Sequence, residues 1–173
     1  MVIWVTGVSG SGKTTIANKV YKTIKFKNKN TVYLDGDEFR SIFNNDLGYE
    51  LEDRDINAVR MTRLCQFLSE QKINIVCGAN LTSQYYRDWC RENIKNYFEV
   101  HIEVPLNVLI DRDIKNLYRK AIAGDIANVV GVDIPFKQPK NADMIIDNTA
   151  KISDFSEIVD SIISESQKLY KYS

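Results

Sequence analysis

Histidine is nearly absent from this sequence, because His101 is the only one among 173 residues. It lies in a strand-like apolar run. A lone histidine in such a run excludes a histidine-based catalytic triad and a metal site built from several histidines. Where the chemistry needs a general base, we therefore expect a carboxylate.

Cysteine is also scarce, and its spacing is uninformative for metals. Cys65, Cys77 and Cys90 are odd in number, and no two of them show C-x-x-C spacing. This pattern argues against a disulfide framework and a zinc site. We expect reduced thiols in a cytoplasmic protein.

Long apolar runs and net charge are missing as well. No segment approaches the roughly 20 apolar residues that span a bilayer, and none resembles a secretory leader. Lysine plus arginine and aspartate plus glutamate both number 23. Zero formal charge without a basic stripe argues against duplex nucleic acid as the main ligand. The length and ordinary composition predict a single domain, residues 1–173, that does not enter a membrane.

One phosphate-binding loop stands out in what remains. Residues 7–14, GVSGSGKT, fit the pattern G-x-x-x-x-G-K-[ST] directly after the apolar residues 2–5. Glycines let successive backbone N–H groups face phosphate oxygens, Lys13 adds a positive charge, and Thr14 offers a hydroxyl to Mg²⁺. The loop therefore predicts binding of a nucleoside triphosphate. The residues expected to bind ATP here are Gly7, Ser9, Gly10, Ser11, Gly12, Lys13, Thr14 and Thr15.

Strand-like and helix-like segments alternate along the chain. The predicted strands are 2–6, 31–34, 73–77, 98–104 and 144–146, and helices are predicted over 14–25, 53–71 and 84–95. In the second helix Ile56, Val59, Leu64 and Phe67 follow helical spacing. A last helix is predicted to have Ser153 as its N-cap. This alternation predicts an α/β fold of the three-layer P-loop NTPase type, with a parallel sheet flanked by helices.

Segment 111–141 interrupts this alternation. It is rich in charged residues and then contains Gly124, Gly131, Pro135 and Pro139. In a phosphoryl-transfer protein, a basic segment of this kind favours a lid that closes over the phosphates. A solvated helix and loop is the alternative.

An acidic pair follows the second strand. Asp35 and Asp37 lie at the carboxyl end of a predicted parallel strand, where open α/β sheets bind their ligands. One carboxylate could organise Mg²⁺ and the other accept a proton from an attacking hydroxyl, and the sequence leaves open which does which. Arg40 would face an anionic acceptor. No guanine-selecting Asn-Lys-x-Asp occurs, so a small-metabolite kinase fits better than a GTPase.

Several further motifs, in the same order, resemble the adenylylsulfate kinase family along nearly the whole chain. They include Asp35-Gly36-Asp37, Asp46-Leu47-Gly48-Tyr49, Asp53-Arg54, the lid run 117–121 and Gly131-x-Asp133-x-Pro135. A gluconate- or shikimate-type kinase would share the phosphate loop but not the Asp-Leu-Gly and lid motifs. A nucleotide sensor without catalysis would be expected to lose Lys13, Thr14 or the acidic pair.

The resemblance implies transfer of the ATP γ-phosphoryl group, with Mg²⁺, to the ribose 3′-hydroxyl of a 5′-modified nucleotide, and a homodimer. It implies catalytic roles for Lys13 and Asp37, a metal-organising role for Thr14, Asp35 and Asp37, and an ATP contact from Arg112. The residues that it assigns to the acceptor are Asp37, Arg40, Tyr49, Arg54, Asn57, Ser83 and Lys120.

The departures from the family pattern gather around the acceptor. Where the family has Phe-Ile-Ser-Pro this chain has Leu81-Thr82-Ser83-Gln84, and Val129 replaces the lid phenylalanine that stacks on adenine opposite the Tyr49 position. Losing one aromatic from a two-sided purine site removes about 1–3 kcal/mol of stacking. These changes favour a smaller pyrimidine with a less charged 5′ group. Within the family that this chain resembles, one relative acts on cytidine diphosphoramidate, which fits this description. The resemblance therefore implies cytidine diphosphoramidate as the acceptor, with adenylylsulfate as the alternative.

Overall fold

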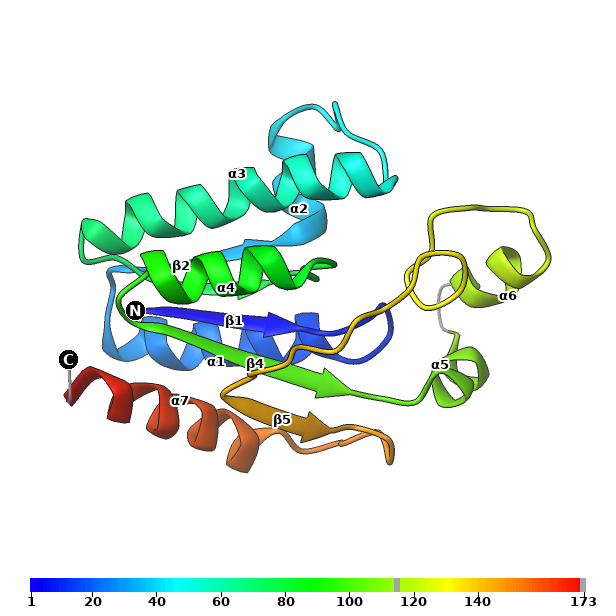
Figure 1. Ribbon diagram of the computed structural model, residues 1–173. Helices are drawn as coiled ribbons and strands as arrows, with labels where there is room; N and C mark the ends of the chain where they lie inside the picture. Colours follow the sequence, from blue (N-terminus) through cyan, green and yellow to red (C-terminus); the bar gives the residue numbers. More distant parts are fainter. Residues whose placement is uncertain (114–115, 172–173) are drawn as a thin grey trace.

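Five parallel strands form the centre of the computed structural model, which describes residues 1–113 and 116–171 (Figure 1). They are β1 (Val2–Thr6), β2 (Thr31–Asp35), β3 (Asn74–Gly78), β4 (Tyr97–Glu103) and β5 (Met144–Asp147). Their order across the sheet is β2-β3-β1-β4-β5, and every neighbouring pair is parallel. The predicted parallel α/β sheet is confirmed.

Helices cover both faces of this sheet. Helices α1 (Lys13–Lys27) and α7 (Ser156–Lys171) pack on one face, and α3 (Leu51–Glu70) and α4 (Gln84–Asn93) pack on the other (Figure 1). Strand β1 is buried on both sides: Ile3 and Val5 pack in the α1/α7 core, whereas Val2 and Trp4 pack in the α3/α4 core. Because successive strand residues face opposite sides of a sheet, one short apolar run contributes to both cores. The three-layer prediction is therefore confirmed.

The three cysteines belong to the second of these cores. Cys65 on α3, Cys77 on β3 and Cys90 on α4 are fully buried free thiols. Burial raises the pKa of both Cys77 and Cys90 above the ordinary value. All three are thus packing residues of this core.

The predicted N-cap of the last helix is wrong, and the buried face of α3 could not be predicted from spacing alone. Helix α7 begins at Ser156 rather than after Ser153, because Asp154 Oδ1 accepts the Ser156 N–H and Phe155 accepts the first helical hydrogen bond, from Val159. Helix α3 turns Ala58, Met61 and Cys65 inward, and leaves Ile56 and Val59 nearly half exposed and Phe67 more so. The helix is confirmed, but its fully buried residues are not the ones whose spacing indicated it.

Three short helices were not predicted. They are α2 (Gly36–Ile42), α5 (Leu106–Arg112) and α6 (Leu117–Ile122). Helices α5 and α6 lie beyond the carboxyl ends of the strands, on the right of Figure 1. Leu109 of α5 and Tyr118 of α6 pack with Val8 and Val130 in a third apolar cluster. The Tyr118 hydroxyl donates to Ser9 O at 2.7 Å. The predicted lid thus rests against the phosphate loop, with its residues 114 and 115 outside the described part of the chain.

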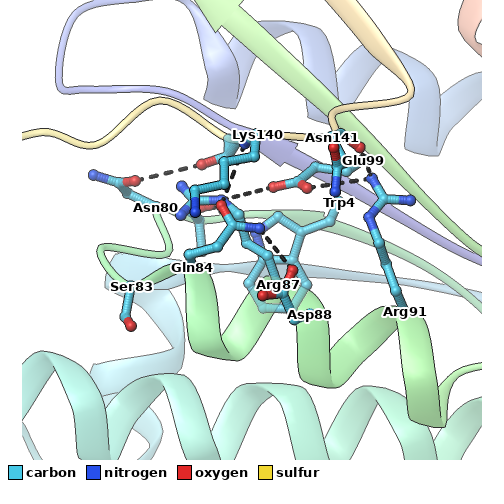
Figure 2. A network of polar contacts seen from close by, with 12 residues as sticks. Trp4, Asn80, Ser83, Gln84, Arg87, Asp88, Arg91, Glu99, Lys140 and Asn141 are labelled. Atoms are coloured by element: carbon cyan, nitrogen blue, oxygen red, sulfur yellow. Dashed lines mark hydrogen bonds and ion pairs between the residues drawn. The ribbon is translucent and has the colours of Figure 1, made fainter.

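The chain returns from the lid to β5 along α4. Lys140 N donates to Gln84 Oε1 (Figure 2). The Arg91 guanidinium forms a two-pronged ion pair with Asp143. Arg87 donates to Glu99 Oε1 at 2.9 Å, and both side chains are buried. The contacts of Lys140 and Asp143 hold the return segment against α4. Among the described residues, no helix is long and apolar enough to cross a membrane.

Candidate active site

The phosphate loop joins β1 to α1 with a glycine in a conformation that other residues rarely adopt. Gly12 has φ 98°, and a Cβ there would lie 2.8 Å from Asn148 Nδ2. That amide donates to Ser11 O at 2.8 Å. Lys13, Thr14 and Thr15 form the first turn of α1, so unsatisfied helix N–H groups face the place predicted for the phosphates.

Arg112 comes to the same end of the sheet from α5. Its guanidinium donates to the carbonyl oxygens of Asn148 at 2.9 Å and Thr149 at 2.6 Å. Since Asn148 also supports the loop at Ser11, Arg112 braces the loop from the side of β5. The structure places this predicted ATP residue beside the loop rather than in the cavity described below.

The two carboxylates of the acidic pair have different surroundings. Asp35, only 9% exposed, ends β2, and its Oδ2 accepts Thr14 Oγ1 at 3.4 Å and Tyr33 OH at 3.1 Å. Its Oδ1 accepts the Asp37 N–H at 3.0 Å, which caps α2. Burial, together with Asp35, raises the pKa of Tyr33, so this phenol stays a hydrogen-bond donor. Asp37 is exposed and faces the cavity.

A cavity of about 540 Å³ lies between the phosphate loop, the acidic pair, α3 and the lid. It collects ten of the residues predicted for the site. They are Gly7, Ser9, Lys13, Thr14, Asp35, Asp37, Arg40, Tyr49, Arg54 and Asn57. Thr15 instead lines a separate groove of about 570 Å³ beside α1, which Thr14 and both carboxylates also border.

Tyr49 and two arginines form the α2–α3 side of the cavity. The guanidinium carbons of Arg40 and Arg54 lie 4.9 and 5.5 Å from the Tyr49 ring centroid. Arg40 donates to Gly48 O and Arg54 to Tyr49 O, each at 2.7 Å. Burial, and then the neighbouring charge of Arg40, lower the pKa of Arg54. Two cations held this closely make the wall attractive to an anion.

Asn57 presents an unsatisfied acceptor to the same cavity. It is 7% exposed, its Nδ2 lies 3.5 Å from Met61 Sδ, and its buried Oδ1 has no hydrogen-bond partner among the described residues. A buried polar atom of this kind is costly unless a ligand or water pairs with it.

Ser83 and Lys120 lie outside the cavity lining. The Ser83 hydroxyl caps α4 by accepting the Tyr85 N–H, and Lys120 is exposed on α6. The phosphate loop also contains Gly10, Ser11 and Gly12, which do not line the cavity. The acceptor roles of Ser83 and Lys120 therefore stay predictions.

The cavity also contains residues that the sequence did not single out. Gly78 ends β3, and Ala79 and Asn80 follow it. The lid contributes Ile126, Ala127, Asn128 and Val130, beside Val129. Asn80, three residues after the predicted strand 73–77, could have been identified by its position near the carboxyl end of that strand. The lid residues carry no local signal, because only tertiary packing brings them opposite Tyr49.

No resident metal cluster accompanies these residues. In the part of the chain that the structure describes, no group of three or more His, Cys, Asp or Glu side chains could hold a metal ion. Thr14 and Asp35 nevertheless form a hydroxyl–carboxylate pair, the donor set by which Mg²⁺ is held together with nucleotide phosphates.

Comparison with known proteins finds related nucleotide kinases. The model of the family described as adenylylsulphate kinase matches residues 1–147. The chain is 41% identical to a cytidine diphosphoramidate kinase of Campylobacter jejuni over 95% of both chains. It is 39% identical to an adenylyl-sulfate kinase of Halothermothrix orenii, over 83% of this chain and 78% of that one. The structure of a Mycobacterium tuberculosis APS kinase in complex with AMPPNP and APS aligns with TM-score 0.83 and 30% identity, covering 96% of each chain.

Proposed function

The chain belongs to the adenylylsulphate kinase family, a family of nucleotide kinases, and we propose that the nucleotide it phosphorylates is cytidine diphosphoramidate. The proposed product carries a new phosphate on the ribose 3′-oxygen. Phosphorylation of adenylylsulfate to 3′-phosphoadenylylsulfate is the second candidate, favoured by relatives such as the adenylyl-sulfate kinase at 39% identity.

The contrast between the two walls of the cavity carries this proposal. Tyr49 offers an aromatic ring on the α3 side, whereas the lid side offers Val129, and Tyr49 is the single aromatic residue among the described residues that line the cavity. A one-sided aromatic platform holds a pyrimidine with less loss than a purine, which depends more on stacking area. The 41% identity to a cytidine diphosphoramidate kinase supports the same choice.

The residues at the cavity floor have complementary roles in the proposed reaction. The acceptor 3′-oxygen attacks the γ-phosphorus of ATP while its proton passes to the Asp37 carboxylate. The bond from the γ-phosphorus to the β–γ bridging oxygen breaks, and ADP leaves with that oxygen. Lys13 stabilises the charge on the transferring group, and Arg40 and Arg54 hold the acceptor's phosphate groups.

Mg²⁺ is the cofactor in this proposal. Thr14 Oγ1 and Asp35 would hold it together with ATP phosphates, and it would supply charge neutralisation of the phosphates. Asp35 suits this role better than that of base, because three donors already fix its carboxylate.

Release of ADP from MgATP, measured with cytidine diphosphoramidate and adenylylsulfate under matched conditions, tests the proposal. We expect a higher kcat/KM for the cytidine compound. A preference for adenylylsulfate would overturn this acceptor assignment and establish the second candidate.

A lid variant tests the observation that carries the proposal. Val129→Phe should raise kcat/KM for adenylylsulfate relative to the cytidine compound, because it restores a second aromatic wall. Val132→Phe, in the same lid but outside the cavity lining, is the matched control and should leave the ratio unchanged.

The resemblance also implies a homodimer in the cytoplasm, which we include in the proposal. Light scattering coupled to size-exclusion chromatography should give twice the 19.9 kDa mass of the chain. A monomeric mass would contradict the dimer and leave the reaction unaffected.

A further inference from the structure

Residues 128–134 of the lid form a tight turn that closes on itself. Val132 N and Ile134 N both donate to Val129 O, Gly131 N donates to Ile134 O, and Val130 pairs with Ile134 in an isolated bridge. Asn128 and Gly131 have φ 67° and 99°, the left-handed region that reverses the chain. The turn is therefore well defined on the side that faces the third apolar cluster.

Asp133 closes the other side of this turn. Its Oδ2 accepts the Asn128 N–H at 2.5 Å and its Oδ1 accepts the Val129 N–H at 2.6 Å. Each carboxylate oxygen thus serves one of two successive backbone amides. Burial acts to raise the pKa of Asp133, but these backbone donors outweigh it and hold the pKa below its ordinary value.

The two clamped residues belong to the wall of the acceptor cavity, whereas Asp133 does not. Asn128 and Val129 line the cavity, and Asp133 is exposed on the outside of the lid. Across the cavity, Arg54 donates to Asn128 O at 2.7 Å. The wall is therefore held at its amides by Asp133 and at one carbonyl by Arg54.

We propose that Asp133 is a positioning residue for the acceptor: it sets the distance of the Asn128–Val129 wall from Tyr49 without touching either substrate. This inference rests on the proposed function, because it assumes that the acceptor occupies this cavity. Loss of the clamp should let the two amides turn to solvent and widen the acceptor subsite, while the phosphate loop at the other end of the cavity is unaffected.

An isosteric substitution provides a sharp test, because an asparagine can accept at one oxygen only. In Asp133→Asn the side-chain NH₂ would face one of the backbone N–H groups, donor against donor. Asp133→Ala removes both acceptors without that clash, and its exposed position lets the chain fold. Asp125→Asn neutralises another exposed lid carboxylate and is the matched control.

Steady-state kinetics and amide hydrogen exchange should be measured for these three variants, using whichever of the two acceptors the wild type prefers. We expect acceptor KM to rise about tenfold in Asp133→Asn and Asp133→Ala, with ATP KM unchanged and no such rise in the control. Exchange at the Asn128 and Val129 amides should become faster in both variants.

Two results would overturn the inference. One is an unchanged acceptor KM in both Asp133 variants. The other is a joint rise of both KM values with a lowered melting temperature, which would indicate a purely structural role. A wild-type enzyme that phosphorylates neither nucleotide would instead defeat the proposed function, and amide exchange would still decide whether Asp133 clamps the turn.

Discussion

The hydroxyl oxygen of Thr14 lies 3.4 Å from Oδ2 of Asp35, so the first turn of α1 meets the end of β2 directly beneath the cavity. The other oxygen of Asp35 holds the backbone of Asp37. This arrangement fixes one carboxylate and aims the next at the space where an acceptor hydroxyl would lie. The proposed division of labour, with Asp35 as metal organiser and Asp37 as base, is based on this difference.

Asp37→Asn should lower kcat by roughly 10²- to 10⁴-fold, because the amide cannot take the acceptor proton. ATP affinity, measured by calorimetry, should stay close to that of the wild type. Glu38→Gln, at the adjacent exposed carboxylate, should keep its kcat. Normal turnover by Asp37→Asn would rule out Asp37 as the base.

Tyr49→Ala should raise acceptor KM by about 5- to 150-fold, the equivalent of roughly 1–3 kcal/mol of base stacking. ATP KM should not change, and Tyr49→Phe should retain most of the affinity. Tyr85→Ala removes a tyrosine that is 65% exposed and outside the cavity lining, which makes it a suitable control. Equal acceptor KM values for Tyr49→Ala and the wild type would contradict the stacking role.

Ser83→Ala should lower the free energy of unfolding by about 1 kcal/mol, because α4 loses its N-cap. Ser83→Asn should restore that stability, since asparagine also caps helices well. Urea denaturation of the three proteins measures both effects. Acceptor KM in the stable asparagine variant then reports on the predicted acceptor role, which an unchanged value would contradict.

Arg87→Met should lower the free energy of unfolding by about 3–5 kcal/mol, because it leaves the Glu99 carboxylate buried without its main partner. Both side chains are almost completely inaccessible, at 0% and 1% exposure. Arg91→Met, at a 26% exposed side chain, should cost much less. Adding Glu99→Leu to Arg87→Met should recover most of the loss, and a double variant no better than the single one would contradict this account.

Stability should fall as the pH drops below about 6.5, because of His101. Burial, reinforced by the nearby Arg87, lowers the pKa of this histidine from its ordinary 6.5, although Glu103 opposes the shift. The unfolded chain therefore binds a proton that the folded chain resists. The stabilisation is present above pH 6.5 and is lost as the pH falls toward the lower folded pKa.

Urea unfolding at pH 7.5 and 5.5 measures this loss, which should reach at most about 1.4 kcal/mol. His101→Phe, which can keep the stack on Phe136, should lose that much less between the two pH values. Parallel losses in the two proteins would assign the pH dependence to other groups.

The sequence predicts best those parts of the site that are contiguous. The phosphate loop and the Asp35–Asp37 pair each lie within a few residues, so their chemistry was readable without knowledge of the fold. The five strands were predicted because each is rich in apolar residues, and β1 is the clearest because it is buried along its whole length.

Features that depend on tertiary packing were predicted less well. Helix α7 starts later than predicted because Asp154 rather than Ser153 supplies the local hydrogen bond. In α3, the buried residues are not those whose spacing indicated the helix. Asn128 lines the cavity because of the way the lid folds, and Asn80 lines it because it lies just after β3. In the structure, Ser83 caps α4. A serine just before a helix can serve as a cap or as a ligand contact, so the sequence alone did not distinguish these two roles.

The hydrogen bond from Tyr118 to Ser9 has a thermodynamic consequence. The lid touches the donor loop through this bond and reaches the acceptor wall through Asn128 and Arg54. An element that contacts two binding sites can couple their affinities, and such coupling is reciprocal. To whatever extent bound ATP improves the affinity for the acceptor, the bound acceptor must improve the affinity for ATP by the same factor.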